Sequence, residues 1–421
     1  MFDVGHDPEM PASRKQLLGS NRPLGALFTA RTVSYAGDSL SLVALMLHVA
    51  ATTGQGLAVA LLLLVGDFVP SLLSPIAGAI SDRFDRRRVM ITCEILQGAL
   101  VLLIALSLPP LPLLLLLVAA RSTAANIFMP ASRSAVPDLV ADKDLPRANS
   151  AIGFGANAAE AFGPFLAAAM LPILGIRGVL VVDAASFLVS AVVLLAIPAL
   201  PPTRTEGDTE SLLAQARVGV GYIVRTPAVR IICLGFCAVV ACNGVDDVAL
   251  VLLAKDTLQT GDSAVGLLLG AVGIGLLIGY ALFGRIDTRL SLTALLVGGF
   301  FVSSAGNLLT GLAWSVAAAF SVQAVRGIGI AAMDVASNTL LQRIVPGALL
   351  GRVFGNLYGA IGIAAAVSYV AGGFLLDATD APTTLIAAGA GGIMVTAVVA
   401  LVLPRALRGS QPENSTAPTT G

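Results

Sequence analysis

Long apolar runs of about 20 residues, separated by short polar turns, make up most of this sequence. Apolar residues are continuous within each run instead of alternating with polar ones, which is typical of membrane-spanning helices and not of β-barrel strands. The pattern therefore predicts an all-α membrane protein with twelve transmembrane helices. We place these spans at 24–50, 56–80, 88–108, 111–136, 147–171, 177–199, 229–254, 263–284, 290–312, 315–340, 350–376 and 381–404.

The longest polar interval, 201–228, lies between the sixth and seventh predicted spans. It divides the chain into two pseudo-symmetric six-helix bundles, at 24–200 and 229–404. The polar ends, 1–23 and 405–421, are expected to be cytoplasmic tails, and the second is expected to be disordered. The later part of the interval predicts an amphipathic cytoplasmic helix that lies on the membrane or on the bundle. Its apolar positions at helical spacing are Leu212, Leu213, Ala216, Val220 and Ile223.

Lys and Arg are unevenly distributed over the predicted connections. Those that follow odd-numbered spans hold only Arg177 and Lys255, whereas those that follow even-numbered spans hold most of the basic residues. The densest group is the loop GAISDRFDRRR at 78–88, between spans two and three. Basic loops stay on the cytoplasmic side, so we expect a multi-pass protein of the cell membrane with both termini in the cytoplasm.

The two predicted bundles carry a sequence repeat. A shift of 205 positions superposes Arg121 on Arg326 and needs no gap. The same register matches further residues, and the charged matches are informative because charges are rare in such a chain. These further pairs are Asp82 with Asp287, Ala131 with Ala336, Ser132 with Ser337, Val140 with Val345, Leu145 with Leu350 and Arg147 with Arg352. Parallel six-helix repeats of this kind occur in secondary transporters.

Composition narrows the function classes. The chain is 56% hydrophobic and 12% charged, with a mean hydropathy of +0.89, as expected for an integral membrane protein. The net charge is zero, so nothing indicates a nucleic-acid partner. The four cysteines lie in apolar runs without a CxxC pair, and we expect neither disulfides nor a metal site. Because the sequence also lacks a nucleotide-binding loop and the HExxH and GxSxG motifs, we expect no cofactor and no enzyme activity.

The loop after span two resembles the G-x-x-x-D-R-x-G-R-R motif of the major facilitator superfamily. The match is carried by Gly78, Asp82, Arg83, Arg86 and Arg87. Asp85 stands where the motif has its second glycine, a departure that affects the backbone of the turn and leaves the charges in place.

Two more motifs of that superfamily are matched in part. Arg121 stands at the position of the family's membrane-embedded arginine, although the following Gln and Gly are absent. Gly163 and Pro164 resemble the core of the antiporter motif G-x-x-x-G-P-x-x-G-G, with alanines at the other glycine positions. Three segments resemble the branch of the family that contains macrolide-efflux and enterobactin-exporter proteins. These segments begin at Met129, Val182 and Val220.

The charged loop suggests a gate. Asp82 lies at the cytoplasmic end of span two, where a carboxylate can cap the positive N-terminus of a neighbouring helix. The resemblance implies that this helix is span eleven, which begins near Gly351, so the contact would hold the two halves closed on that side. The loop's arginines would pair with carboxylates such as Asp138 in one conformation and release them in another. The alternative is that these arginines only determine topology.

Ionisable residues inside the predicted spans are costly and are therefore functional candidates. Asp38 lies near the middle of span one and Arg121 lies about 15 Å deep in span four. The pair would either couple transport to a proton or bind substrate, or else form a permanent ion pair that locks the first half. Arg326 would hold an anionic group or pair with an acid of span seven. The other candidates are Asp67, Glu160, Asp246 and Asp247.

Small residues indicate a seam between the halves. Gly163-Pro164 would kink span five and let it pack closely on span eight. Gly and Pro are also common in membrane helices without such a role. The glycines expected on span eight are Gly270, Gly273, Gly275 and Gly279.

Together these features predict a secondary active transporter of the major facilitator fold that works by alternating access. The sequence and the resemblance favour a monomeric proton-coupled antiporter that exports drugs or a secondary metabolite. Its partners would be an amphipathic small molecule, protons and membrane lipids. A siderophore or lipid exporter of the same fold is the nearest alternative, and a membrane sensor or scaffold is a distant one.

Overall fold

The computed structural model describes residues 18–53, 56–202, 212–260, 262–285 and 291–409. This part of the chain is built of helices and connecting turns and contains no β-strand. Each of the twelve predicted ranges overlaps a helix. Over the described residues, nine helical segments are long and apolar enough to cross a membrane, so the all-α membrane fold is confirmed and the number of twelve spans stays a prediction.

The first half contains α2 (Arg22–Thr53), α3 (Gly56–Arg83), α4 (Arg86–Ser107), α5 (Leu111–Leu139) and α6 (Leu145–Leu194). A short 3₁₀ turn, η1 (Asp142–Asp144), precedes α6. The range of α6 covers both the fifth and the sixth predicted spans. They are separated at Gly175, whose φ of 64° and ψ of −179° lie in a backbone region that is essentially restricted to glycine.

The second half contains α8 (Pro227–Asn243), α9 (Asp246–Leu252), α10 (Asp262–Phe283), α11 (Leu292–Gly311), α12 (Val316–Ile344), α13 (Leu350–Ala378) and α14 (Ala381–Gly409). The π-helical turn η2 (Leu253–Thr257) follows α9, and the 3₁₀ turn η3 (Gly347–Leu349) precedes α13. The predicted seventh span at 229–254 is therefore interrupted instead of continuous. The interruption follows Asn243 and places Asp246 at the start of a new helix.

The connection between the halves contains the amphipathic helix α7 (Leu212–Arg225). This helix includes the predicted apolar positions. It packs on α3 and α13, so it lies on the bundle. The tail predicted to be disordered from 405 is helical over its first residues, because α14 continues through Pro404 to Gly409. Residues 410–421 lie outside the described part of the chain.

Side-chain caps define several helix starts. Asp85 accepts a hydrogen bond from the Arg88 backbone N–H at 2.9 Å and caps α4. Asp85, which departs from the family motif, therefore has a local role as the cap of α4. Its φ of −55° does not require glycine. Ser291 and Ser315 cap α11 and α12 in the same way. Asp380 precedes α14, and hydrogen bonds from the Thr383 hydroxyl and backbone N–H lower the pKa of its carboxyl.

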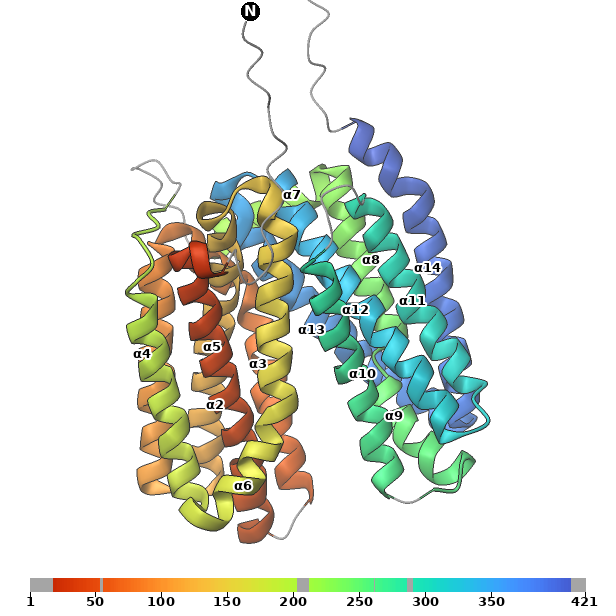
Figure 1. Ribbon diagram of the computed structural model, residues 1–421, viewed down its shortest axis with the longest axis horizontal. Helices are drawn as coiled ribbons and strands as arrows, with labels where there is room; N and C mark the ends of the chain where they lie inside the picture. The colour runs from red at the N-terminus through yellow and green to blue at the C-terminus, as the bar shows by residue number, and fades with distance from the viewer. Residues whose placement is uncertain (1–17, 54–55, 203–211, 261, 286–290, 410–421) are drawn as a thin grey trace, which may run out of the picture.

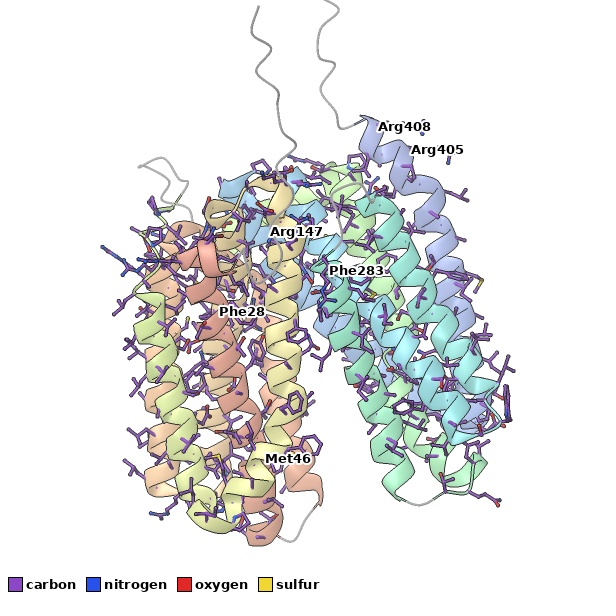
Figure 2. The ribbon with its side chains drawn as sticks, viewed as in Figure 1. Phe28, Met46, Arg147, Phe283, Arg405 and Arg408 are labelled. Carbon is purple, nitrogen blue, oxygen red and sulfur yellow. The ribbon has the colours of Figure 1, made fainter. Side chains whose placement is uncertain are left out.

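The two bundles meet at the end of the molecule where α2 begins and α14 ends, and they diverge toward the opposite end (Figure 1). The main contacts between them are made by α3 with α13 and by α6 with α10. Arg147, Arg405 and Arg408 lie toward the end where the bundles meet, and Met46 lies toward the other end (Figure 2). The closed end of this conformation is therefore the basic end.

Glycines permit the closest approach between the halves. A Cβ at Gly78 would overlap the carbonyl oxygen of Gly351, and a Cβ at Gly355 would lie 2.5 Å from the Ser74 carbonyl oxygen. The backbones of α3 and α13 thus touch directly, as small residues allow in membrane helix pairs. This close packing brings the end of α3 against the start of α13.

We predict that Gly78→Ala disfavours this conformation, because overpacking a tight contact costs about 1–3 kcal/mol. The reporter is disulfide cross-linking between Asp142→Cys and Arg343→Cys in a cysteine-free background, since these two exposed residues form an ion pair at 2.8 Å across the halves. The cross-linking yield should fall. Gly270→Ala is the matched control, because no described atom lies within 4 Å of its added Cβ. Equal yields in the two variants would show that the α3–α13 contact tolerates a methyl group.

Candidate functional site

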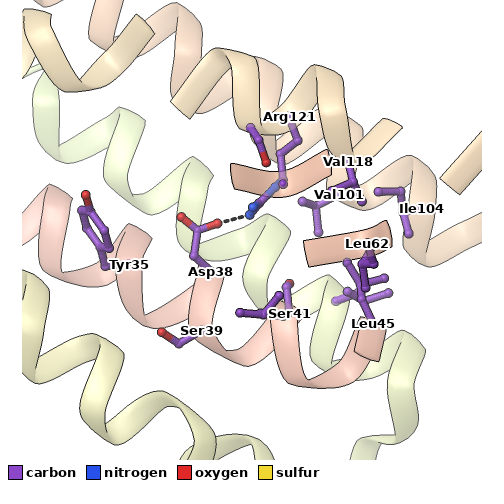
Figure 3. A pocket seen from close by; sticks show the side chains of 14 residues that line it. Tyr35, Asp38, Ser39, Ser41, Leu45, Leu62, Val101, Ile104, Val118 and Arg121 are labelled. Carbon is purple, nitrogen blue, oxygen red and sulfur yellow. Dashed lines mark hydrogen bonds and ion pairs between the residues drawn. The ribbon is translucent and has the colours of Figure 1, made fainter. Parts of the chain in front are cut away.

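Asp38 of α2 and Arg121 of α5 form an ion pair beside a pocket in the first half (Figure 3). The pocket measures about 270 Å³. The Asp38 side chain is 26% exposed and the Arg121 side chain 18%, so the pair is shielded yet reachable from the pocket. Apolar side chains from five helices complete much of the wall and give the pocket an amphipathic lining. They include Leu45, Leu62, Val101, Ile104, Val118 and Leu180.

The second half has a corresponding but closed pair. Arg326 of α12 is paired with Asp246 of α9, and the two side chains are only 6% and 9% exposed. Arg326 also donates to Gln323 at 3.2 Å, and Gly306 packs against its aliphatic stem. The prediction that Arg326 holds an anion or an acid of span seven is thus resolved in this conformation in favour of the acid. The burial of this pair indicates a brace within the second half.

The sequence repeat explains how the two pairs are related. The repeat mate of Asp38 is Asn243, and the mate of Ser41 is Asp246. The acid therefore stands about one helical turn further along the chain in the second half. Asn243 has a different task there, since it donates to Ser304 at 3.1 Å and accepts from Asn307 at 2.9 Å. The two halves thus pair equivalent arginines, Arg121 and Arg326, with acids from different helical turns.

Asp82 joins the two halves. Its carboxylate accepts hydrogen bonds from the backbone N–H groups of Gly351 at 2.8 Å and Arg352 at 2.9 Å, in the first turn of α13. The Arg352 guanidinium lies 3.4 Å away, and Asp82 is 2% exposed. The contact has the geometry that the sequence and the resemblance lead us to expect for a carboxylate at a helix N-terminus.

The arginines of the same loop differ in their surroundings. Arg86 is buried, is paired with Asp138 and donates to the Gly347 carbonyl oxygen of the other half at 3.0 Å. Arg87 donates to the Leu195 carbonyl oxygen at 2.7 Å within its own half. Arg83 is exposed, with its guanidinium 5.8 Å from the centre of the Phe84 ring. Among these three, only Arg86 makes a described contact between the halves.

The expected seam of Gly163-Pro164 against span eight is wrong for Gly163 in this structure. An added Cβ at Gly163 would meet Ser39 of α2, in the same half. Gly275 and Gly279 pack on α12, and no atom of the described residues lies within 4 Å of a Cβ added at Gly270 or Gly273. The α6–α10 contact instead lies nearer the start of α6, where Gly153 packs on the Tyr280 ring.

The structure does not describe the side chains of some predicted site residues. Asp67 lies on α3, Glu160 on α6 and Asp247 on α9, but their side chains are outside the described part of the structure. The same holds for the Pro164 ring. Their roles stay predictions.

A polar cluster where the halves meet was not predicted from the sequence. Arg133 of α5 is paired with Asp334 of α12 at 3.6 Å, and Arg31 of α2 is buried nearby on the first half. Tyr280 donates its hydroxyl to Asp334 at 3.0 Å, so this acid is bound within the protein. Arg31, like Asp38, is an ionisable residue inside a predicted span. The rule that made Asp38 a candidate could therefore have identified Arg31 from the sequence.

Comparison with known proteins identifies the family. The model of the Major Facilitator Superfamily matches residues 27–253 and 239–420. The chain belongs to the major facilitator superfamily. It is therefore a membrane transporter of the MFS type and not an enzyme, which excludes the sensor or scaffold alternative. Transporters of this superfamily carry small-molecule substrates, often with protons.

Two Bacillus subtilis (strain 168) relatives are named as uncharacterized MFS-type transporters. YfiS is 26% identical over 379 residues, covering 86% of this chain and 89% of the relative. YkuC is 26% identical over 306 residues, covering 66% of this chain and 68% of the relative. Neither name specifies a substrate, so the narrower resemblance to macrolide-efflux and enterobactin-exporter proteins stays a prediction.

Solved structures share the fold at low sequence identity. A bacterial homologue of the iron transporter ferroportin in an outward-facing state has a TM-score of 0.74 at 18% identity, covering 91% of this chain and 99% of that one. The human organic anion transporter MFSD10 (TETRAN) has a TM-score of 0.76 at 16% identity, with 90% and 99% covered. The transporter FucP in its outward conformation has a TM-score of 0.69 at 12% identity, with 92% and 98% covered.

We predict that Asp82→Asn lowers the cross-linking yield of the Asp142→Cys and Arg343→Cys reporter. The amide loses the charge that interacts with the α13 N-terminus, a contact worth about 1–2 kcal/mol in a partly buried setting. This should shift the conformational ratio about five- to thirtyfold. Asp85→Asn is the matched control, because Asp85 lies in the same loop and caps its own helix. An unchanged yield in Asp82→Asn would leave Asp82 with a role in topology or folding only.

Proposed function

We propose that this transporter is a proton-coupled antiporter that exports an amphipathic drug or secondary metabolite from the cytoplasm by alternating access. The observation that carries the proposal is the Asp38–Arg121 pair beside an amphipathic pocket. A carboxylate that is shielded by apolar walls and balanced by one arginine has a protonation state that is sensitive to small changes around it. Such a group is suited to exchanging a proton when the cavity changes sides.

The closed basic end supports the alternating-access part of the proposal. The basic connections put this end in the cytoplasm by the positive-inside rule. Asp82, Arg86 and Gly78 contribute to contacts between the halves there, and the halves diverge toward the opposite end. In this reading the structure is the outward-facing conformation, and the gate motif stabilises it by acting only when the cytoplasmic side is closed.

The proposal is tested in everted membrane vesicles with an acidic lumen. Addition of an exported compound should dissipate the proton gradient, which is measured by recovery of quenched acridine fluorescence. Macrolides, dyes and catecholate siderophores are added in turn, so that a siderophore exporter is recognised by its own class of compound. Proton antiport would be contradicted if a compound accumulated in the vesicles without proton release and if uncouplers did not reduce this accumulation.

We predict that Asp38→Asn abolishes this proton-linked transport, because the amide cannot exchange a proton, while insertion in the membrane is retained. Asp38→Glu keeps the carboxyl group and should retain part of the activity. The double variant Asp38→Asn with Arg121→Gln replaces the ion pair by two neutral amides. If the pair is only a structural lock, this neutral pair should restore transport, whereas a coupling role requires that the double variant stays inactive.

A further inference from the structure

Two arginines of the first half are buried where the halves meet at the closed end. Arg31 of α2 is 2% exposed and Arg133 of α5 is 6% exposed. Arg31 donates to the Ser132 hydroxyl at 3.0 Å and to the Tyr35 hydroxyl at 3.4 Å, and its guanidinium stands over the Tyr35 ring. It also contacts the Met129 sulfur at 3.3 Å. All of these partners are uncharged.

The charges of this cluster do not balance within the described residues. Arg133 has one carboxylate partner, Asp334 of the other half, at 3.6 Å. Described carboxylates form no salt bridge with Arg31. The Nε atoms of both arginines and one terminal nitrogen of Arg133 are buried without a hydrogen-bond acceptor. One acid thus faces two cations, and a buried charge without a counter-charge is strongly destabilising.

The described groups that surround the cluster from the second half supply no further negative charge in this conformation. The Tyr280 hydroxyl of α10 donates a hydrogen bond to the Asp334 carboxylate. This bond reduces the acceptor capacity that Asp334 has left for Arg133. Asn338 of α12 donates to Asp334 at 2.8 Å, and the Tyr358 hydroxyl of α13 donates to Asn338 at 3.3 Å. Asp334 is therefore shared among several donors. When the halves separate at this end, Arg133 would lose this acid and the first half would present two arginines.

We propose that Arg31 and Arg133 form the binding subsite for the acidic group of an amphipathic organic anion, and that Asp334 occupies this subsite in its place when the halves close. The inference rests on the proposed export function for its direction and names the class of substrate. Arginine is suited to this task because its planar fork binds carboxylate, sulfonate or phosphate groups with two hydrogen bonds. A second half that carries its own carboxylate can displace such a group as it closes.

The neighbouring pocket indicates the rest of the ligand. Tyr35 both accepts from Arg31 and lines the pocket beside Asp38. Arg31 and Asp38 are seven residues apart on α2, which places them about 10 Å apart along the helix axis. A ligand with its acid at Arg31 and an apolar body of one or two rings toward the pocket would span this distance. The apolar walls of the pocket favour such a body.

The test compares two probes that share the same rings. 8-Anilinonaphthalene-1-sulfonate carries the acid, and N-phenyl-1-naphthylamine lacks it. Saturable binding of each is measured by equilibrium dialysis with the full-length protein in phosphatidylcholine nanodiscs, after subtraction of empty nanodiscs. Because no proton gradient is present, the result is independent of whether transport is proton-coupled.

We predict that the wild-type protein binds the sulfonate more tightly than the amine. Arg31→Gln should weaken sulfonate binding by roughly tenfold or more, as expected for loss of a charged hydrogen bond, and should leave the amine unchanged. Arg31→Lys keeps the positive charge but loses the planar fork, so its affinity should lie between those of Arg31→Gln and the wild type. Asp334→Asn should strengthen sulfonate binding, because Arg133 loses its competing acid.

Arg405→Gln is the control, since Arg405 is exposed on α14 and its described hydrogen bond goes to the Leu401 carbonyl oxygen of its own helix. Equal changes for both probes would mean that the arginines and Asp334 only brace the halves, and would overturn the proposal. Absence of saturable sulfonate binding in both wild type and Asp334→Asn would overturn it as well. Weaker sulfonate binding in Asp334→Asn would exclude the proposed competition.

Discussion

The constraint on which this structure depends is the high free-energy cost of an unpaired charge in the membrane interior. Asp38, Asp246 and Asp334 are paired with an arginine from another helix of the bundle or from the other half. These pairs link helices that are far apart in sequence. The helices can therefore be almost uniformly apolar and still adopt defined positions.

The pairs differ in where they place their charge relative to the moving interface. Arg326–Asp246 is sealed within one half, so it stays intact in any rigid-body motion of the halves. Arg133–Asp334 and the Asp82 contact with Gly351 cross between the halves, so they exist only when the basic end is closed. Asp38–Arg121 lies within the first half but beside a pocket. In the proposed function, a bracing role, a gating role and an exchange role would be separated by location.

Small residues make the cross-half contacts possible. Gly78, Gly351 and Gly355 bring two backbones into contact, and this approach allows the Asp82 carboxylate to reach the free N–H groups of α13. A helix N-terminus has several such donors without partners, so a single acid satisfies two of them. The hydrogen bonds and the glycine packing consequently depend on each other. Both are lost together when the halves separate.

Much of the architecture could be predicted from the sequence because apolar runs must be helical in a bilayer and basic loops define a side. The Asp38–Arg121 pair was accessible for a related reason, because charges are rare enough for each to be a candidate. The contact of Asp82 with span eleven was expected from the family resemblance. The sequence did not determine which way a side chain faces, since these helices are apolar on all sides and carry little directional pattern. For that reason the neighbour of Gly163, the choice of Asp246 for Arg326 and the grouping of Arg31 with Arg133 were decided only by the tertiary structure. Each depends on the rotation of a helix about its own axis, which packing between distant segments sets.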